Sequence, residues 1–167
     1  MPRVIVLVPN AEGEAALVAD AVARGAAHVR FTEVEPRVVS AAPVIGRSVR
    51  TLRGSDDLRD SDAVVFVAGH ASEATDTLLE ALDAAEHEQP ADAFLDTVFA
   101  VAGTTDAQLL SRVARLGGII VSPPRAAGDA MREAEALGER VATVVEWVRH
   151  ARSHEHGRAH GASHHHD

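Results

Sequence analysis

Several residue types are scarce or absent in this 167-residue chain, and each absence excludes a class of chemistry. The chain has no cysteine, which rules out disulfides, thiolate metal sites and thiol catalysis. It has no lysine either, so all 16 basic residues are arginine and a Schiff-base lysine mechanism is impossible. Tyrosine is missing as well, and Trp147 is the single tryptophan.

Basic residues are fewer than acidic ones, and long apolar runs are absent from the sequence. The formal net charge is −9, which argues against nucleic acid as a partner because phosphate contacts require a basic face. No apolar run approaches the roughly 20 residues that a membrane span needs. The first residues show no small-residue cleavage site and are expected to enter a strand. We therefore expect a cytoplasmic protein with neither nucleic-acid nor membrane partners.

What the chain does contain is an alternation of short apolar runs and segments with helical spacing. Strands are expected at Arg3–Pro9, His28–Val34, Ala63–Ala68, Leu95–Ala102 and Ile119–Ser122. Helices are expected at Ala15–Ala23, Glu73–Glu86, Asp106–Leu116 and Ala130–His150. The connection from Glu35 to Asp60 has no strong periodicity, and we expect it to be mostly loop.

This alternation predicts a doubly wound α/β domain, with a parallel sheet covered by helices on both faces. Right-handed crossovers and five strands favour the strand order 2-1-3-4-5. The ligand crevice of such a sheet lies at the carboxyl ends of the first, third and fourth strands. Three loops should therefore meet there: Asn10–Glu14, Gly69–Ser72 and Gly103–Thr105.

Between about Arg3 and Trp147 the chain resembles a known family. The best matching pieces are Ala21–Ala26, Asp57–Phe66, Leu109–Ser111 and Gly138–Ala142. On these residues the chain resembles the flavodoxin-like NAD(P)H:quinone oxidoreductases of the WrbA type. The resemblance implies a flavodoxin-like three-layer sandwich, FMN as cofactor, and assembly into dimers or tetramers.

The family's FMN phosphate loop aligns with Asn10–Glu14, but the residues differ from the family's pattern. Hydroxyls and backbone N–H groups at a helix N-terminus hold a phosphate dianion, and here only Gly13 fits, with Asn10 as one further donor. Glu12 and Glu14 are common residues for a first helical turn. At about 5 Å and an effective dielectric near 20, each would repel a unit negative charge by roughly 3 kcal/mol before screening by solvent and salt. The two acids therefore disfavour FMN.

The two loops that would face the flavin ring are also reduced. In the family the loop after the third strand carries aromatic and polar groups, and the loop after the fourth strand is longer and Gly-rich. Here they contain Gly69 and His70 after the third strand and Gly103, Thr104 and Thr105 after the fourth. His70 is the candidate catalytic residue, as a general base or as a donor that orients a ligand. The alternative is a loop histidine that faces water.

After about Arg149 the composition changes abruptly. We divide the chain into a flavodoxin-like domain at 1–149 and a tail at 150–167, which is expected to be disordered because it has almost no apolar side chains. Imidazole nitrogens suit nickel, zinc or copper. If the last helix continued, His150 and His154 would share one face. The candidate metal ligands are His154, His156, His160, His164, His165 and His166.

Three functional hypotheses follow. The first is a flavodoxin-like domain with impaired or lost FMN binding that acts as a non-catalytic binding, regulatory or assembly module. The second is a divergent FMN-dependent NAD(P)H:quinone oxidoreductase, which would use backbone N–H groups around Gly13 and the segment Gly103–Thr105. The third is divalent metal binding through the tail. A homodimer is expected, and an unknown protein partner is possible.

Overall fold

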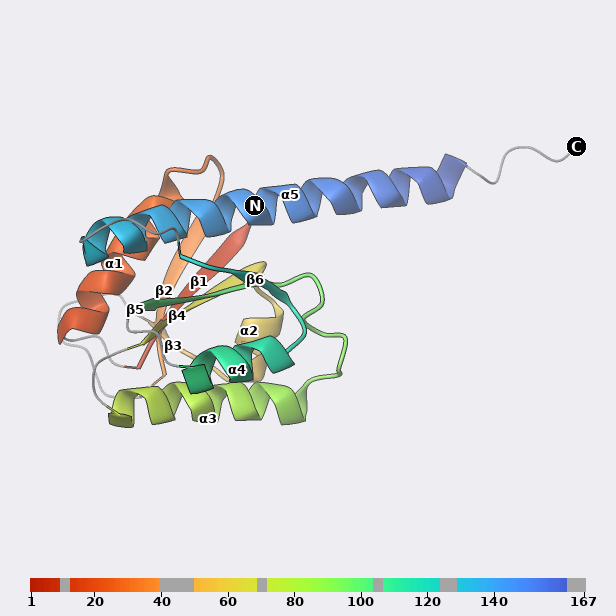
Figure 1. Ribbon diagram of the computed structural model, residues 1–167. Helices are drawn as coiled ribbons and strands as arrows, with labels where there is room; N and C mark the ends of the chain where they lie inside the picture. Colours follow the sequence, from red (N-terminus) through yellow and green to blue (C-terminus); the bar gives the residue numbers. More distant parts are fainter. Residues whose placement is uncertain (10–12, 40–49, 69–71, 104–106, 124–128, 162–167) are drawn as a thin grey trace, which may run out of the picture.

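A computed structural model describes residues 1–9, 13–39, 50–68, 72–103, 107–123 and 129–161, with side chains throughout except at 72–74 and 155–161. Within these residues six parallel strands form one sheet in the order β3-β2-β1-β4-β5-β6 (Figure 1). The strands are β1 (Arg3–Val8), β2 (Glu33–Val38), β3 (Arg50–Thr51), β4 (Ala63–Ala68), β5 (Val98–Gly103) and β6 (Ile119–Val121).

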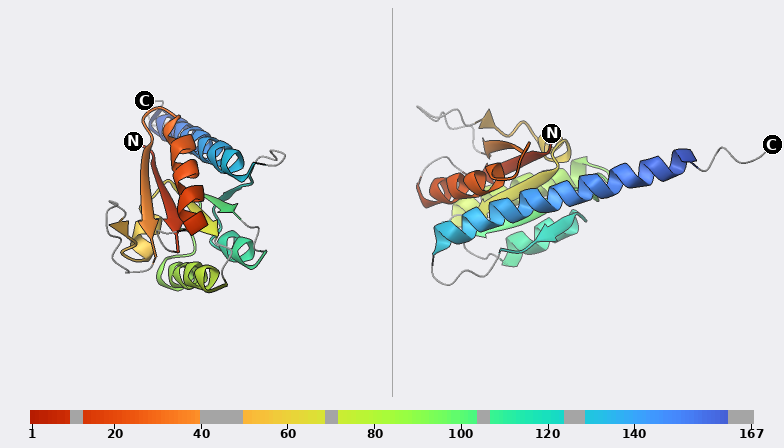
Figure 2. Two further views of the ribbon diagram at one scale, coloured as in Figure 1. Left: turned by 90° about the vertical axis from the view of Figure 1, so that its left-hand side faces the viewer. Right: turned by 90° about the horizontal axis from the view of Figure 1, so that it is seen from above.

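Helices cover both faces of the sheet, as Figure 2 shows from two directions. The helices are α1 (Gly13–Ala27), α2 (Ser55–Arg59), α3 (Ser72–Glu88), α4 (Ala107–Arg115) and α5 (Ala130–Gly161). Helices α1 and α5 pack on one face, and α2, α3 and α4 pack on the other. Over the residues that the structure describes, no helix combines the length and the apolar content that crossing a membrane requires.

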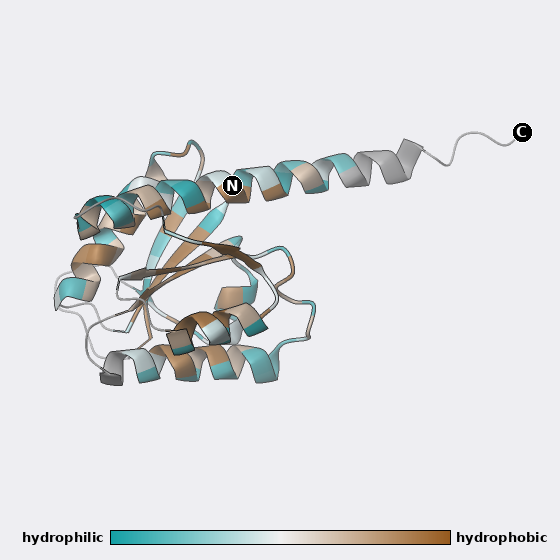
Figure 3. Cartoon of the chain, in the orientation of Figure 1, coloured by the Kyte–Doolittle hydropathy of each residue, from teal (hydrophilic) through white to brown (hydrophobic). Residues whose placement is uncertain are grey.

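The central strands are apolar on both sides because each side contributes to a separate core. In β1, Val4 and Val6 point toward α1 and α5, while Ile5 and Leu7 point toward the opposite helices. All four side chains are fully buried. Figure 3 shows the same distribution, with apolar residues concentrated on the strands and on the inner sides of the helices. A continuous apolar run is the expected pattern for a parallel strand covered on both faces.

The parallel sheet with helices on both faces is confirmed, but the sheet has six strands in the described residues instead of five. The sixth is the two-residue edge strand β3, which lies with α2 in the connection that was expected to be mostly loop. Both are too short to produce a periodic signal in the sequence. Without β3, the remaining five strands keep the predicted order.

The second strand was placed too early. It was expected at His28–Val34 and lies instead at Glu33–Val38, because α1 continues to Ala27 beneath α5. A turn follows, in which Phe31 has a positive φ of 64°. The alternation in HVRFTEV therefore belongs mostly to a turn, and the polar residues of EVEPRV belong to a strand whose charges are paired.

The last helix extends further than expected. It was expected to end at His150, and its backbone continues to Gly161, across the boundary between 149 and 150. Two ion pairs tie this part of the helix to the body: Arg149 to Asp62 at 3.3 Å and Arg152 to Asp96 at 2.5 Å. The segment 150–161 is therefore helical and not irregular. The division into a domain and a tail stays a prediction.

Helices α1 and α5 cross very closely, through one glycine on each. A Cβ added to Gly138 would lie 2.0 Å from the carbonyl oxygen of Val22, and a Cβ added to Gly25 would lie 1.8 Å from that of Glu135. Both obstacles are backbone atoms, which cannot rotate away as a side chain can. The two glycines therefore set the distance between the helices.

We predict that Gly138→Ala destabilises the fold by about 1–3 kcal/mol, because the new methyl group must push the two backbones apart. At a helix position with free space around it, a Gly→Ala change would stabilise the protein by up to about 1 kcal/mol. The sign of the change in the free energy of unfolding therefore shows whether the two backbones are in close contact. Urea unfolding measures the difference, and Ser153→Ala on the exposed side of α5 serves as a control with little effect. A Gly138→Ala protein at least as stable as the parent would refute the close crossing.

Candidate functional site

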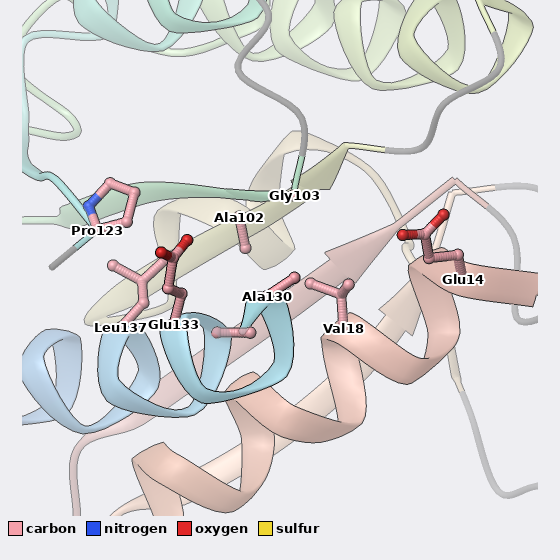
Figure 4. A pocket seen from close by; sticks show the side chains of 9 residues that line it. Glu14, Val18, Ala102, Gly103, Pro123, Ala130, Glu133 and Leu137 are labelled. Atoms are coloured by element: carbon pink, nitrogen blue, oxygen red, sulfur yellow. The ribbon is translucent and has the colours of Figure 1, made fainter. Parts of the chain in front are cut away.

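A cleft of about 240 Å³ lies at the carboxyl edge of the sheet, where the N-terminal ends of α1 and α5 approach the end of β5 (Figure 4). It is smaller than the roughly 300–1,000 Å³ typical of pockets for drug-sized ligands. The described residues that line it come from three elements, α1, β5 and α5, and from the segment after β6. They are Glu14, Val18, Ala102, Gly103, Pro123, Ala130, Glu133, Ala134 and Leu137.

The cleft combines an apolar wall with two acids. Val18, Ala102 and Leu137 are buried in the core beneath it. Glu14 comes from the first turn of α1 and Glu133 from the first turn of α5, and Figure 4 shows them on either side of the opening. No lining residue within the described part of the chain is basic. The arrangement suits a small ligand with an apolar body and a positive charge, and it opposes an anion.

The N-terminus of α5 already holds a carboxylate of the protein itself. Asp129 precedes the helix, and its Oδ1 accepts hydrogen bonds from the backbone N–H groups of Met131 at 3.1 Å and Arg132 at 3.2 Å. The side chain therefore satisfies N–H groups that would otherwise be available to a bound anion. The other oxygen of this carboxylate pairs with Arg132 Nε at 3.3 Å, so Glu133 is the acid that this end of α5 adds to the lining of the cleft.

The N-terminus of α1 starts at Gly13, which has a positive φ of 71°. Glycine adopts this conformation without the strain that a Cβ would bring. Glu14 follows in the first turn, where a negative charge interacts favourably with the helix dipole. Asn10 and Glu12, the other predicted residues of the phosphate loop, lie outside the described residues.

Gly103 closes the other side of the cleft at the end of β5. Its φ is 89°, and a Cβ there would lie 2.6 Å from the carbonyl oxygen of Ala68 at the end of the neighbouring strand. Only glycine allows the two strand ends to approach in this way. The structure thus brings Gly13 and Gly103 to the same edge of the sheet, as the topology predicted, with Glu14 and Gly103 lining one cleft.

The other predicted ring-binding residues remain predictions. Gly69, His70, Thr104 and Thr105 lie outside the described residues, and with them the proposed catalytic role of His70. Of the predicted metal ligands, His154 is described on α5, and His156 and His160 belong to the same helix without described side chains. His164, His165 and His166 lie beyond the described part.

The sequence analysis missed the contribution of α5 to this site. Glu133, Ala134 and Leu137 were considered only as parts of a packed helix, yet they form one wall of the cleft. The sequence could have indicated this contribution, because the last helix of a doubly wound sheet begins at the carboxyl edge of the last strand. An acid in its first turn, such as Glu133, therefore lies near the crevice.

The most connected group of charges lies away from the cleft, on β1, β2 and α2. Glu35 accepts hydrogen bonds from Arg3 Nε at 2.7 Å and from the buried Arg37, which also pairs with Asp57 at 3.4 Å. The hydrogen bond from Arg3, with a second from Arg37, lowers the pKa of Glu35 from 4.5 to about 2. Each charge in this group has an opposite charge as partner, so the group holds the sheet edge to α2 and offers no site for a ligand.

No protein-family model matches the sequence, and no curated protein matches it. Similar folds occur among solved structures. A flavodoxin of Streptococcus pneumonia TIGR4 is 11% identical, with a TM-score of 0.53 over 85% of this chain and 97% of the flavodoxin. FerB of Paracoccus denitrificans, an NAD(P)H:(acceptor) oxidoreductase and flavoenzyme, is 17% identical, with a TM-score of 0.60 over 89% and 98%.

At these identities the likeness concerns the fold alone. The chain has an α/β fold of the flavodoxin-like kind, and its chain length is close to that of both solved structures. The predicted fold class is confirmed at this level. The narrower resemblance to the WrbA type stays a prediction.

The lowered pKa of Glu35 predicts a pH dependence of stability with a definite sign. Because the folded pKa is depressed, the stabilisation is complete above about pH 4.5 and is lost as the pH falls toward about 2. Glu35→Gln should therefore lower the free energy of unfolding at pH 7, on the order of 2 kcal/mol, and the deficit should shrink below pH 4.5. Urea unfolding at a series of pH values measures this.

Glu33→Gln provides the matched control, since Glu33 is exposed on the same strand. It should change stability by no more than about 0.5 kcal/mol at any pH. A Glu35→Gln deficit that stays constant from pH 7 to pH 3 would contradict the assignment.

Proposed function

We propose that this protein is a flavodoxin-like domain that binds FMN weakly or not at all and acts as a non-catalytic binding, regulatory or assembly module. The observation that carries the proposal is the chemistry of the cleft at the carboxyl edge, where flavodoxin-like sheets hold ligands. Glu14 and Glu133 line it, Asp129 occupies the nearby helix N-terminus, and the described lining residues include no arginine.

The electrostatics of this cleft oppose a phosphate group. A phosphate monoester carries close to two negative charges near pH 7 and would have to share the cleft with the carboxylates of Glu14 and Glu133. In the ordinary flavin-phosphate arrangement, free N–H groups at a helix N-terminus provide the attraction. Here the helix that follows the predicted phosphate loop is α1, and its first turn carries the acid Glu14. The proposed ligand class is a small molecule or peptide side chain with an apolar body and a cationic group.

A second candidate function is a divergent FMN-dependent NAD(P)H:quinone oxidoreductase. Two observations favour it: the similar solved structures include a flavodoxin and a flavoenzyme, and the glycines at positions 13 and 103 keep positive φ angles at the crevice edge. In this alternative, backbone N–H groups around Gly13 hold the phosphate and Gly103–Thr105 face the ring. His70 is then the candidate proton donor or acceptor.

A homodimer is part of the proposal for the non-catalytic module. Some large apolar side chains remain exposed: Trp147 on α5 is 67% exposed and Ile120 on the edge strand β6 is 43% exposed. Such side chains are common at contacts between protein chains. An additional protein partner and a cytoplasmic location are expected with it.

We predict that the purified protein shows no flavin absorbance and takes up added FMN with a Kd weaker than about 1 µM. Replacing both acids, by Glu14→Gln with Glu133→Gln, should raise the affinity for FMN by about tenfold because it removes two repulsive charges. Quenching of FMN fluorescence on titration measures both affinities.

Glu139→Gln is the matched control, since it removes the same charge from an exposed position of α5 outside the cleft and should leave the affinity unchanged. Flavin bands in the protein as purified, or FMN binding in the nanomolar range, would refute the proposal and support the oxidoreductase alternative. If the affinity for FMN rose equally in the control and in the double variant, the repulsion would not come from the two acids of the cleft.

A further inference from the structure

The C-terminal part of α5 projects beyond the body of the domain, as Figure 1 and the right-hand view of Figure 2 show. His150 and His154 lie on this part, one helical turn apart. Residues at positions i and i+4 of a helix lie one above the other on the same face. Both histidines are exposed to solvent.

The two imidazole rings meet at their outer nitrogens. Nε2 of His150 and Nε2 of His154 are 3.0 Å apart, and the ring planes are nearly perpendicular, at 84°. Without a metal, this distance fits a hydrogen bond in which one neutral imidazole donates its proton to the other. When both protons reside on Nδ1, the same distance leaves two nitrogen lone pairs on neighbouring atoms.

Ion pairs fix the direction in which this nitrogen pair points. Arg149 pairs with Asp62 and Arg152 with Asp96, so the side of α5 that carries the two arginines faces the body. At 100° per residue, the histidine pair lies about 150° around the helix from these arginines. The pair therefore faces solvent, and the two neighbouring positive charges are already matched by carboxylates.

We propose that His150 and His154 form a chelating site for one divalent transition-metal ion of the copper and nickel type. With metal–nitrogen bonds of about 2.0–2.1 Å, nitrogens 3.0 Å apart subtend an angle of about 90° at the metal. This angle suits the square-planar or octahedral coordination of Cu²⁺ and Ni²⁺ better than the tetrahedral coordination of Zn²⁺. Imidazole is a preferred ligand for these ions.

The chelate uses two protein ligands, and water supplies the others. Within the described part of the chain, no group of three or more His, Asp or Glu side chains is placed to hold a metal together. A bound ion would replace the proton shared between the two Nε2 atoms, and that proton would move to Nδ1 of its ring. The ion would also bridge two consecutive turns and so stabilise the projecting helix.

The test separates this pair from the later histidines of the chain. A background protein of full length carries alanine in place of His156, His160, His164, His165 and His166. We expect calorimetric titration with Ni²⁺ alone to show one ion bound per chain of this background protein. Adding His154→Ala should weaken the binding by at least about tenfold, because a single imidazole cannot chelate.

An exchange variant tests the geometry at constant composition. In the same background, Ala151→His with His154→Ala leaves the number of histidines unchanged but places the two imidazoles on adjacent residues, which do not face each other on a helix. It should lose the Ni²⁺ site as fully as His154→Ala does, while His87→Ala should leave binding unchanged. A background protein that binds no Ni²⁺, or an exchange variant that binds it equally well, would overturn the proposal.

Discussion

The close crossing of α1 and α5 is the contact on which most of the other features depend. Gly25 and Gly138 let each helix approach the backbone of the other, and no larger residue fits at either position without displacing a carbonyl group. This crossing brings the first turn of α5, with Glu133, over the carboxyl edge of the sheet. It also directs the other end of the same helix past the sheet, as Figure 1 shows, and His150 and His154 in this C-terminal half of α5 are exposed to solvent.

Helix α5 therefore contributes to two different sites, the cleft at its N-terminus and the histidine pair in its C-terminal part. At its N-terminus α5 narrows the crevice and adds Glu133 to a lining that already contains Glu14. On either side of Arg152, which is tied to Asp96, it carries an exposed pair of imidazoles, His150 and His154. The cores on the two faces of the sheet are built from ordinary apolar residues, whereas the charges lie at the edge and on the projecting helix. Because the core residues set the fold and other residues form the sites, one architecture can carry different functions.

Much of the fold was predictable, because burial on both faces produces continuous apolar runs that mark the central strands. The second strand was misplaced, since Glu35 and Arg37 are polar residues inside a strand and are stable there only through their partners Arg3 and Asp57. The edge strand β3 was missed because a strand of two residues is too short to show an alternation of apolar and polar side chains. Of the candidate site, Gly13 and Gly103 lie at the same edge of the sheet, their role in binding stays a prediction, and Glu133 was not foreseen.

The sequence by itself determined the α/β class, the order of the main strands and the acidic character of the crevice, since these follow from local periodicity and residue type. Only the tertiary structure decided that α5 forms a wall of the cleft, that Asp129 caps it, and that the helix continues through His150 and His154. The physical reason is that these features depend on contacts between segments far apart in the chain. Local patterns report which residues prefer to be buried, but not which distant backbone they will be buried against.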